Sequence, residues 1–449
     1  MPSADAVCIL RQPRPPRVWH AALAGAGLLL GLLSGCGGGN SSETRIIGGD
    51  VEAVVDQPQG PNTLEIVVDN GPGPDGGFSI GAANLPYVSV KVCAPGSSTA
   101  CVTVDHVFLD TGSIGLRLLR SAVAGLALPA VQGGAGGQGR VVECYPFVVG
   151  AVWGPVARAD VSLGGETAAS LPIQLIDDME PRVAEPSPDC LDAANGQLLA
   201  SATSLQAKGV LGVGMLSYDC GLACESGDYL GGYTLYYACS NASTCTPLAV
   251  PAEEQVANPV SALAVNNNGT ILVLPALSAT GAPVARGRLV LGIGTQSNNQ
   301  LPLSATVLHV ETDPFSPSYL YLATTVGGKR FPYSYIDSGS NGLFFDDATL
   351  AGACLGSGGG GAWFCPATLQ PRTAEIRSPS GALAQVEFAI GNADVLFSTA
   401  NTAFANLGGS AGAANEGAFV WGLPFFYGRA VYTSIWGQAL SASGPWYAF

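Results

Sequence analysis

Two short strings, one in each half of the chain, carry the residues best suited to chemistry. The first spans Val107–Ser113 (VFLDTGS) and the second Ser334–Ser340 (SYIDSGS), so both are apolar, β-prone runs ending in Asp-[Thr/Ser]-Gly-Ser. In each, a buried strand would deliver a carboxylate, a glycine would turn the chain, and hydroxyl groups would hold the carboxylate. Two copies predict a duplicated fold that brings Asp110 and Asp337 face to face.

Two carboxyl groups in contact have a defined chemistry. They cannot both ionise cheaply, so they share one proton. The ionised carboxylate can take a proton from a water molecule held between them, while the protonated one hydrogen-bonds the carbonyl oxygen under attack. The product of that attack is a neutral gem-diol, the intermediate of peptide hydrolysis.

The composition favours a β-rich protein that is large enough for two or three domains. The 449 residues are 47% hydrophobic and only 11% charged, with 61 glycines and 31 prolines, which suits many strands and turns. We therefore expect an all-β fold. The formal charge of −15 argues against nucleic acid as a partner. After residue 36 no apolar run is long enough to predict a membrane span.

The N-terminus predicts an exported, lipid-anchored protein. Residues 1–35 combine a positive start with an apolar stretch over Ala21–Leu33, as in a signal peptide. Leu33–Cys36 (LSGC) resembles a bacterial lipobox, in which Cys36 would be lipidated; an ordinary secretion signal is the alternative. Residues 36–79 are then interpreted as a tether and acidic leader with one strand, Leu64–Val68. Gly37 after the cysteine favours the outer membrane by the same resemblance, facing the periplasm or the surface.

The remaining ten cysteines fit an oxidising compartment. Four pairs lie close in sequence and leave one long-range pair, which together predict five disulfides. The close pairs are Cys93/Cys101, Cys220/Cys224, Cys239/Cys245 and Cys354/Cys365, and the long-range pair is Cys144/Cys190. A zinc cluster within residues 220–245 is the alternative, but it lacks the Cys-x-x-Cys spacing. No metal or cofactor is expected.

Short apolar runs separated by turns continue from Tyr87 to the end of the chain. The first half predicts strands at Tyr87–Val92 and Val102–Leu109 and a long hairpin over 141–163. We expect an N-terminal lobe over 80–285, with a cysteine-rich insertion at 219–250, and a C-terminal lobe over 286–449. The second lobe repeats the style of the first.

The order of these motifs resembles the pepsin-like aspartic peptidases, from about Tyr87 to Tyr432. In that family each Asp-Thr-Gly is followed by an apolar-apolar-Gly strand that threads beside it. Val210–Gly212 (VLG) and Val420–Gly422 (VWG) occupy those places here. The resemblance implies two β-rich lobes related by pseudo-twofold symmetry around a central cleft, a monomer, and an extended peptide as substrate or ligand.

The resemblance also implies a role for each residue of the two motifs. Asp110 and Asp337 would form the catalytic dyad, and Ser113 and Ser340 would hydrogen-bond their outer oxygens. Thr111 and Ser338 would make hydroxyl contacts between the lobes. Gly112 and Gly339 provide the turns, and Gly212 and Gly422 the threading strands.

The chain departs from the family at the hairpin that covers the dyad. The family pairs a tyrosine of this flap with a tryptophan seven residues after the first aspartate, where this chain has Arg117. Counting back from Leu163 puts Phe147 at the tyrosine position, with Tyr145 on the same face of the strand. Either a shifted hairpin uses Tyr145 or the flap uses an apolar ring only.

Three other functions fit the sequence less well or remain open. Arg45–Gly49 (RIIGG) imitates the activation site of trypsin-like peptidases, but His106 and His309 lack the context of a catalytic base. The paired carboxylates of a glycosidase would not explain the glycine strands. A binding protein for peptides or glycans on the same fold, with little turnover, stays open because fold does not guarantee activity.

Overall fold

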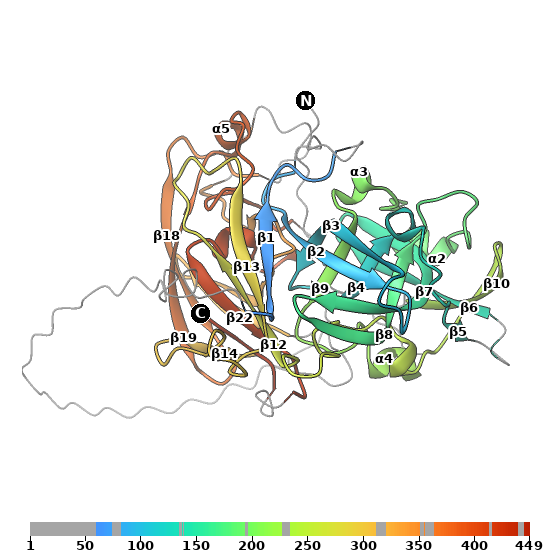
Figure 1. The fold of residues 1–449 in the computed structure, drawn as a ribbon. Helices are drawn as coiled ribbons and strands as arrows, with labels where there is room; N and C mark the ends of the chain where they lie inside the picture. Colours follow the sequence, from blue (N-terminus) through green and yellow to red (C-terminus); the bar gives the residue numbers. More distant parts are fainter. Residues whose placement is uncertain are drawn as a thin grey trace, which may run out of the picture.

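The computed structural model describes residues 60–73, 82–133, 137, 139–193, 196–226, 234–310, 320–350, 354, 363–412, 415–438 and 444–449. The predicted signal peptide (residues 1–35), the predicted lipidation site Cys36 and the predicted tether up to residue 59 lie outside these ranges. Within the described ranges the chain is built mainly of β-strands (Figure 1). The all-β expectation is therefore confirmed.

The first half supplies the strands β1 (Thr63–Val68), β2 (Pro86–Cys93), β3 (Cys101–Asp110), β4 (Ile114–Leu119), β5 (Gln132–Gly133), β6 (Gly139–Phe147), β7 (Gly150–Leu163), β8 (Glu166–Ile176), β9 (Gly209–Val213), β10 (Tyr236–Asn241) and β11 (Thr244–Pro247). The strands β12 (Gly269–Leu274), β13 (Ala285–Leu291), β14 (Val307–His309), β22 (Arg429–Ser434) and β23 (Trp446–Ala448) extend the same sheet. Its order is β11-β10-β6-β7-β8-β4-β9-β3-β2-β1-β13-β12-β22-β23-β14.

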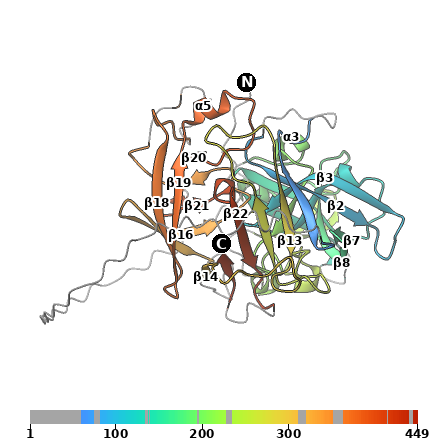
Figure 2. The ribbon, with the colours of Figure 1, turned by 60° about the vertical axis from the view of Figure 1, so that its left-hand side comes forward.

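The second half forms a separate sheet from the strands β15 (Leu322–Val326), β16 (Lys329–Ile336), β17 (Leu343–Phe344), β18 (Gln370–Arg377), β19 (Leu383–Ile390), β20 (Gly408–Gly409) and β21 (Val420–Trp421). Its order is β19-β18-β15-β16-β21-β17-β20. Both views show these strands on one side of the molecule and β2–β8 on the other, with β1, β13 and β22 between them (Figures 1 and 2). The two-lobed expectation is thus confirmed.

The helices of the described residues are short. They are η1 (Arg120–Val123), α2 (Pro188–Ala193), α3 (Ala202–Leu205), α4 (Leu222–Ser226), η3 (Ala252–Glu254), α5 (Ala393–Phe397) and η5 (Leu423–Phe425). None of the described helices is both long and apolar enough to cross a membrane.

The strand predicted within the acidic leader is confirmed as β1. It pairs antiparallel with β13 along its whole length and with β2 at its C-terminal end. β1 therefore joins the N-terminal strands to the central strands β12, β13 and β22, because each of these is the next neighbour in the sheet. The predicted hairpin over 141–163 is confirmed as β6–β7, with its turn at Val148 and Val149.

The same three-strand crossing occurs once in each lobe. In the N-terminal lobe β9 lies between β3, to which it runs parallel, and β4, to which it runs antiparallel, with Gly212 beside Asp110. In the C-terminal lobe β21 lies between β16 and β17 with the same two directions. Such a strand is covered on both faces, which explains why all five residues of β9 are buried and apolar or glycine.

All five predicted disulfides are confirmed. They join Cys93 to Cys101, Cys144 to Cys190, Cys220 to Cys224, Cys239 to Cys245 and Cys354 to Cys365. The insertion at 219–250 contributes β10, which pairs with β6 and so widens the sheet that carries the hairpin. The Cys144–Cys190 bond joins β6 to α2.

The glycines of the crossing strands are predicted to be irreplaceable. A Cβ atom on Gly212 would lie 2.6 Å from the backbone nitrogen of Ile114, and one on Gly422 would overlap the carbonyl oxygens of Ser340 and Gly342. We expect Gly212→Ala and Gly422→Ala each to lower the free energy of unfolding by about 3 kcal/mol or more. Urea denaturation measures the effect.

Gly125→Ala is the matched control, because nothing lies within 4 Å of the Cβ position there. Its free energy of unfolding should stay within about 0.5 kcal/mol of the wild-type value. Equal unfolding midpoints for Gly212→Ala and Gly125→Ala would contradict the tight crossing.

Candidate active site

Each aspartate stands at the end of a buried strand and is held by its own turn. Asp110 is the last residue of β3, after the buried run Val107–Leu109. The backbone N–H of Gly112 donates to Asp110 Oδ1 at 2.7 Å, and the Ser113 hydroxyl donates to Oδ2. The carboxylate is thus oriented through both of its oxygens.

The second motif repeats this arrangement in the other lobe. Asp337 follows β16, and the backbone N–H of Gly339 donates to its Oδ1 at 2.8 Å. The Ser340 hydroxyl donates to Asp337 Oδ2 at 2.6 Å. Each serine therefore bonds the outer oxygen that the resemblance assigned to it.

Reciprocal hydrogen bonds tie the two turns together. The N–H of Thr111 donates to Ser338 Oγ at 3.0 Å, and the N–H of Ser338 donates to Thr111 Oγ1 at 2.9 Å. Ser338 Oγ also donates to the carbonyl oxygen of Leu109 at 2.9 Å. Because these bonds join residues of different lobes, they fix the separation of the two carboxyl groups.

The structure brings Asp110 and Asp337 into direct contact. Their carboxyl groups hydrogen-bond each other, and both residues are completely buried. A Cβ atom on Gly112 would lie only 2.5 Å from Asp337 Oδ1, so glycine is required at this turn. The site therefore holds two carboxyl groups at one point and excludes water from their surroundings.

Burial raises the pKa of both aspartates, and the charge of Asp110 adds to the rise at Asp337. Loss of solvation, followed by the charge of Asp110, raises the pKa of Asp337 well above its usual range. Burial also raises the pKa of Asp110, against the opposing hydrogen bonds from Ser113 and Asp337. The two acids thus favour a state in which one proton is shared between them, with the larger rise in pKa at Asp337.

Of the two flap candidates, Tyr145 is the one whose pKa is affected by the charge of Asp110. Its ring and that of Phe147 are both buried and meet edge-on at a centroid distance of 5.1 Å. Burial, opposed by the charge of Arg117, raises the pKa of Tyr145, and the charges of Asp219 and Asp110 raise it further. Phe147 packs in the apolar cluster with Tyr87 and Phe108.

The tip of the β6–β7 hairpin reaches the other lobe. Val148 packs against the apolar cluster of the C-terminal lobe that contains Phe344 and Trp363. Its neighbour Val149 packs against the N-terminal cluster that contains Tyr145. The tip of the hairpin thus contacts apolar clusters of both lobes.

Arg117 occupies the place of the expected tryptophan and stacks on the tyrosine. Its guanidinium lies 3.6 Å from the centroid of the Tyr145 ring. The same group pairs with Glu143 of β6, at 2.5 Å and 3.2 Å, and with Asp219 at 3.2 Å. A buried ion pair and a cation–π contact are therefore found where the resemblance predicted a tyrosine–tryptophan hydrogen bond.

The cluster around Arg117 is sealed by further hydrogen bonds. The Tyr236 hydroxyl donates to Asp219 Oδ2 at 2.8 Å, and the backbone N–H of Val256 donates to the Tyr236 oxygen. Burial, and the hydrogen bond and charge of Glu143, raise the pKa of Asp219 well above its usual range. Asp219 therefore retains its proton beside Glu143.

Sequence reasoning missed Glu143, Asp219 and Tyr236, which come from three distant segments. The only signal was an arginine within the apolar strand β4, where a buried cation requires carboxylate partners.

A segment ahead of β2 docks into the C-terminal lobe and was also not foreseen. The buried Asn84 donates to the carbonyl oxygens of Asn341 and Phe404 at 2.9 Å each. Its own side-chain oxygen accepts from the Phe404 N–H and from the Tyr427 hydroxyl. Asn84 has a φ of 55°, a backbone conformation that asparagine tolerates better than most residues.

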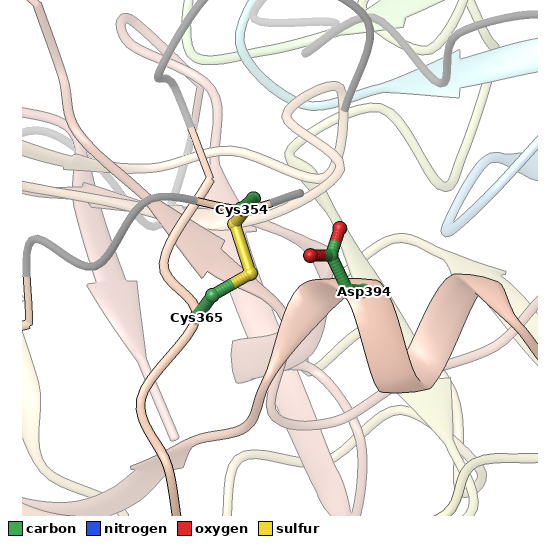
Figure 3. A group of neighbouring side chains, drawn as sticks. All are labelled: Cys354, Cys365 and Asp394. Carbon is green, nitrogen blue, oxygen red and sulfur yellow. A yellow bond between two sulfur atoms is a disulfide. The ribbon is translucent and has the colours of Figure 1, made fainter. Parts of the chain in front are cut away.

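One group of side chains has the composition of a metal site but not its chemistry. The Asp394 carboxylate of α5 lies beside Cys354 and Cys365, within 4.8 Å of their sulfur atoms (Figure 3). The two sulfurs are bonded to each other, so neither is a thiolate. A single carboxylate remains, which is too few ligands to hold a metal ion.

The pKa shifts of the dyad predict how stability depends on pH. A carboxyl group whose pKa is higher in the folded protein stabilises the fold least at high pH, because the folded state then loses a tightly held proton. Stability should fall as the pH rises above about 4, the pKa of an unfolded aspartate.

In the wild type the free energy of unfolding should fall with rising pH. We expect Asp337→Asn to make this fall shallower by up to about 1.4 kcal/mol per pH unit. Urea denaturation of wild type and variant between pH 4 and pH 7 measures the difference, with Asp394→Asn as a control outside the dyad. Parallel stability curves for the wild type and Asp337→Asn would contradict the raised pKa.

The Arg117 cluster predicts a large loss of stability when its cation is removed. Arg117→Met leaves the buried Glu143 and Asp219 without a cation, which should cost about 3–5 kcal/mol of stability at neutral pH. Urea denaturation at pH 7 measures the loss. Arg286→Met removes an exposed pair with Glu65 and should change stability by less than about 1 kcal/mol.

Comparisons with known proteins place the chain in one family. A crystal structure of aspartic proteinase from Irpex lacteus is similar with a TM-score of 0.45 and 14% sequence identity, over 86% of this chain and 96% of that one. No curated protein matches the chain. A family model described as "Protein of unknown function (DUF3443)" matches residues 58–449. The chain therefore belongs to the DUF3443 family.

Proposed function

We propose that this chain is an aspartic endopeptidase that cleaves extended peptides. The observation that carries the proposal is the completely buried, contacting pair Asp110–Asp337, with a serine hydroxyl and a glycine N–H bonded to each acid. Two acids in contact are costly to bury, so their presence in duplicate, matching turns is best explained by chemistry at that point.

The protons can be followed through the proposed reaction. The ionised Asp110 takes a proton from the attacking water, and the protonated Asp337 donates its proton to the peptide carbonyl oxygen. The new C–O bond gives a neutral gem-diol. Collapse of the gem-diol returns one proton to the dyad and transfers another to the leaving amine, so the C–N bond breaks and the dyad is regenerated.

The hairpin would regulate access to this pair. Because both aspartates are buried while Val148 contacts the C-terminal lobe, a peptide could reach them only after the β6–β7 tip moves. Closure behind the peptide would then exclude water and place Tyr145 over the bond to be cleaved.

The N-terminal motif supports anchoring of the enzyme at the bacterial envelope. Lipidation of Cys36 after removal of residues 1–35 would leave the two lobes tethered by residues 37–59. The five disulfides are consistent with an oxidising compartment such as the periplasm. The outer membrane, facing the periplasm or the surface, is the proposed location.

A binding protein with little or no turnover is the second candidate. It is favoured by the closed hairpin, by the inaccessible dyad, and by Arg117 in place of the family's tryptophan. Such a protein would hold a peptide or a glycan between the lobes without hydrolysing it.

Incubation of the purified chain with an unfolded protein between about pH 3 and pH 6 distinguishes the two. The peptidase should produce fragments, a statine-type inhibitor should block cleavage, and Asp110→Asn and Asp337→Asn should each lower kcat by at least about a thousandfold. Asp394→Asn is the control, as an acid outside the dyad. Absence of fragments at every pH, with an intact fold, would favour the binding protein.

A further inference from the structure

A cavity lies in the C-terminal lobe, away from the two aspartate motifs. Its volume is about 860 Å³, and its lining includes no residue of 110–113 or 337–340. It opens between the hairpin β18–β19, the segment after β12, and η5 with the start of β22. Apolar and aromatic side chains form much of the wall, among them Leu343, Phe388, Trp421 and Phe425.

Arg429 brings a cation to this apolar cavity. Its guanidinium lies 4.7 Å from the centroid of the Phe425 ring. It donates to the carbonyl oxygen of Phe425 at 2.7 Å and to that of Glu387 at 3.2 Å. A guanidinium has five N–H groups, so these two bonds to neutral acceptors leave donors for a ligand.

Arg429 differs from most buried cations because its known partners carry no charge. Within the part of the chain that the structure describes, no carboxylate lies within ion-pair distance of Arg429. Burial alone lowers its pKa to about 10, so it remains a cation at neutral pH. A partly buried cation without an anion is unfavourable, and a bound anion would relieve that cost.

Arg372 lines the same cavity and provides the contrast. Its Nε lies 3.9 Å from Asp347 Oδ2, and its Nη1 donates to Gln370 Oε1 and to the carbonyl oxygen of Pro371. This arginine already has a carboxylate. Glu387 also lines the cavity, but it is exposed and its carboxylate is not within ion-pair distance of Arg429. Among the described residues, the cavity therefore offers one positive charge without a carboxylate partner, beside an apolar wall.

We propose that this cavity is a binding site for a monocarboxylate with an apolar body. One unmatched cation suits one negative charge, and the planar guanidinium suits the two oxygens of a carboxylate. The aromatic wall would hold an aliphatic chain or a ring, and the volume is in the range of small-molecule sites. The site is separate from the dyad, so the proposal does not depend on peptidase activity.

Calorimetric titration of the purified chain tests the proposal with two probes, octanoate and 4-phenylbutyrate, each compared with its neutral amide. The carboxylates should bind, and the amides should bind at least about tenfold more weakly, because they cannot form a charge-assisted bond with Arg429. Arg429→Met should weaken carboxylate binding to the level of the amides.

Arg372→Met is the matched control and should leave the affinity within about threefold, since Arg372 already pairs with Asp347. Asp337→Asn should also bind normally, because the dyad is not part of the cavity. Ala279→Trp, at the exposed rim, should block binding without disturbing a buried contact, and it provides the test if Arg429→Met does not fold.

Several results would overturn the proposal. These are no binding of either carboxylate at millimolar concentration, equal binding of carboxylate and amide, or an unchanged affinity in Arg429→Met or Ala279→Trp. Loss of binding in Asp337→Asn would place the carboxylates at the dyad instead, and an equal loss in Arg372→Met would remove the special role of Arg429.

Discussion

The reciprocal bonds between Thr111 and Ser338 are the constraint on which the site depends. Each backbone N–H donates to the hydroxyl of the other lobe, so neither turn can shift without breaking both bonds. This pair of bonds holds Asp110 against Asp337 in a position that electrostatics opposes. Burial and repulsion then favour a shared proton on the pair, which is the state that the proposed reaction requires.

The sheets around the dyad tolerate this arrangement because they are rigid and tightly packed. The crossing strands β9 and β21 are covered on both faces, and Gly212 and Gly422 let neighbouring backbones approach where a methyl group would not fit. β1 and β13 connect the strands of the N-terminal lobe to β12 and β22 of the central sheet. The extensive packing of the sheets thus offsets the unfavourable free energy of burying two acids.

The two arginines Arg117 and Arg429 differ in the groups that surround their charge. Arg117 is surrounded by Glu143, Asp219 and the Tyr145 ring, so its charge is used within the protein to hold the hairpin strand β6. Among the described residues, Arg429 contacts the carbonyl oxygens of Phe425 and Glu387 and the Phe425 ring, so we propose that its charge is available to a ligand. The same side chain is structural in one lobe and a candidate binding group in the other.

The sequence alone determined the all-β class and the strands that end at Asp110 and Asp337, and it indicated the four cysteine pairs that lie close in sequence. These follow from local information, since apolar runs, turn residues and close cysteine spacing act over a few neighbouring positions. Only the tertiary structure decided that Arg117 meets Glu143 and Asp219, that Val148 contacts the other lobe, and that no carboxylate of the described residues lies within ion-pair distance of Arg429. Those facts depend on which distant segments pack together, and a linear pattern of residues does not record that packing.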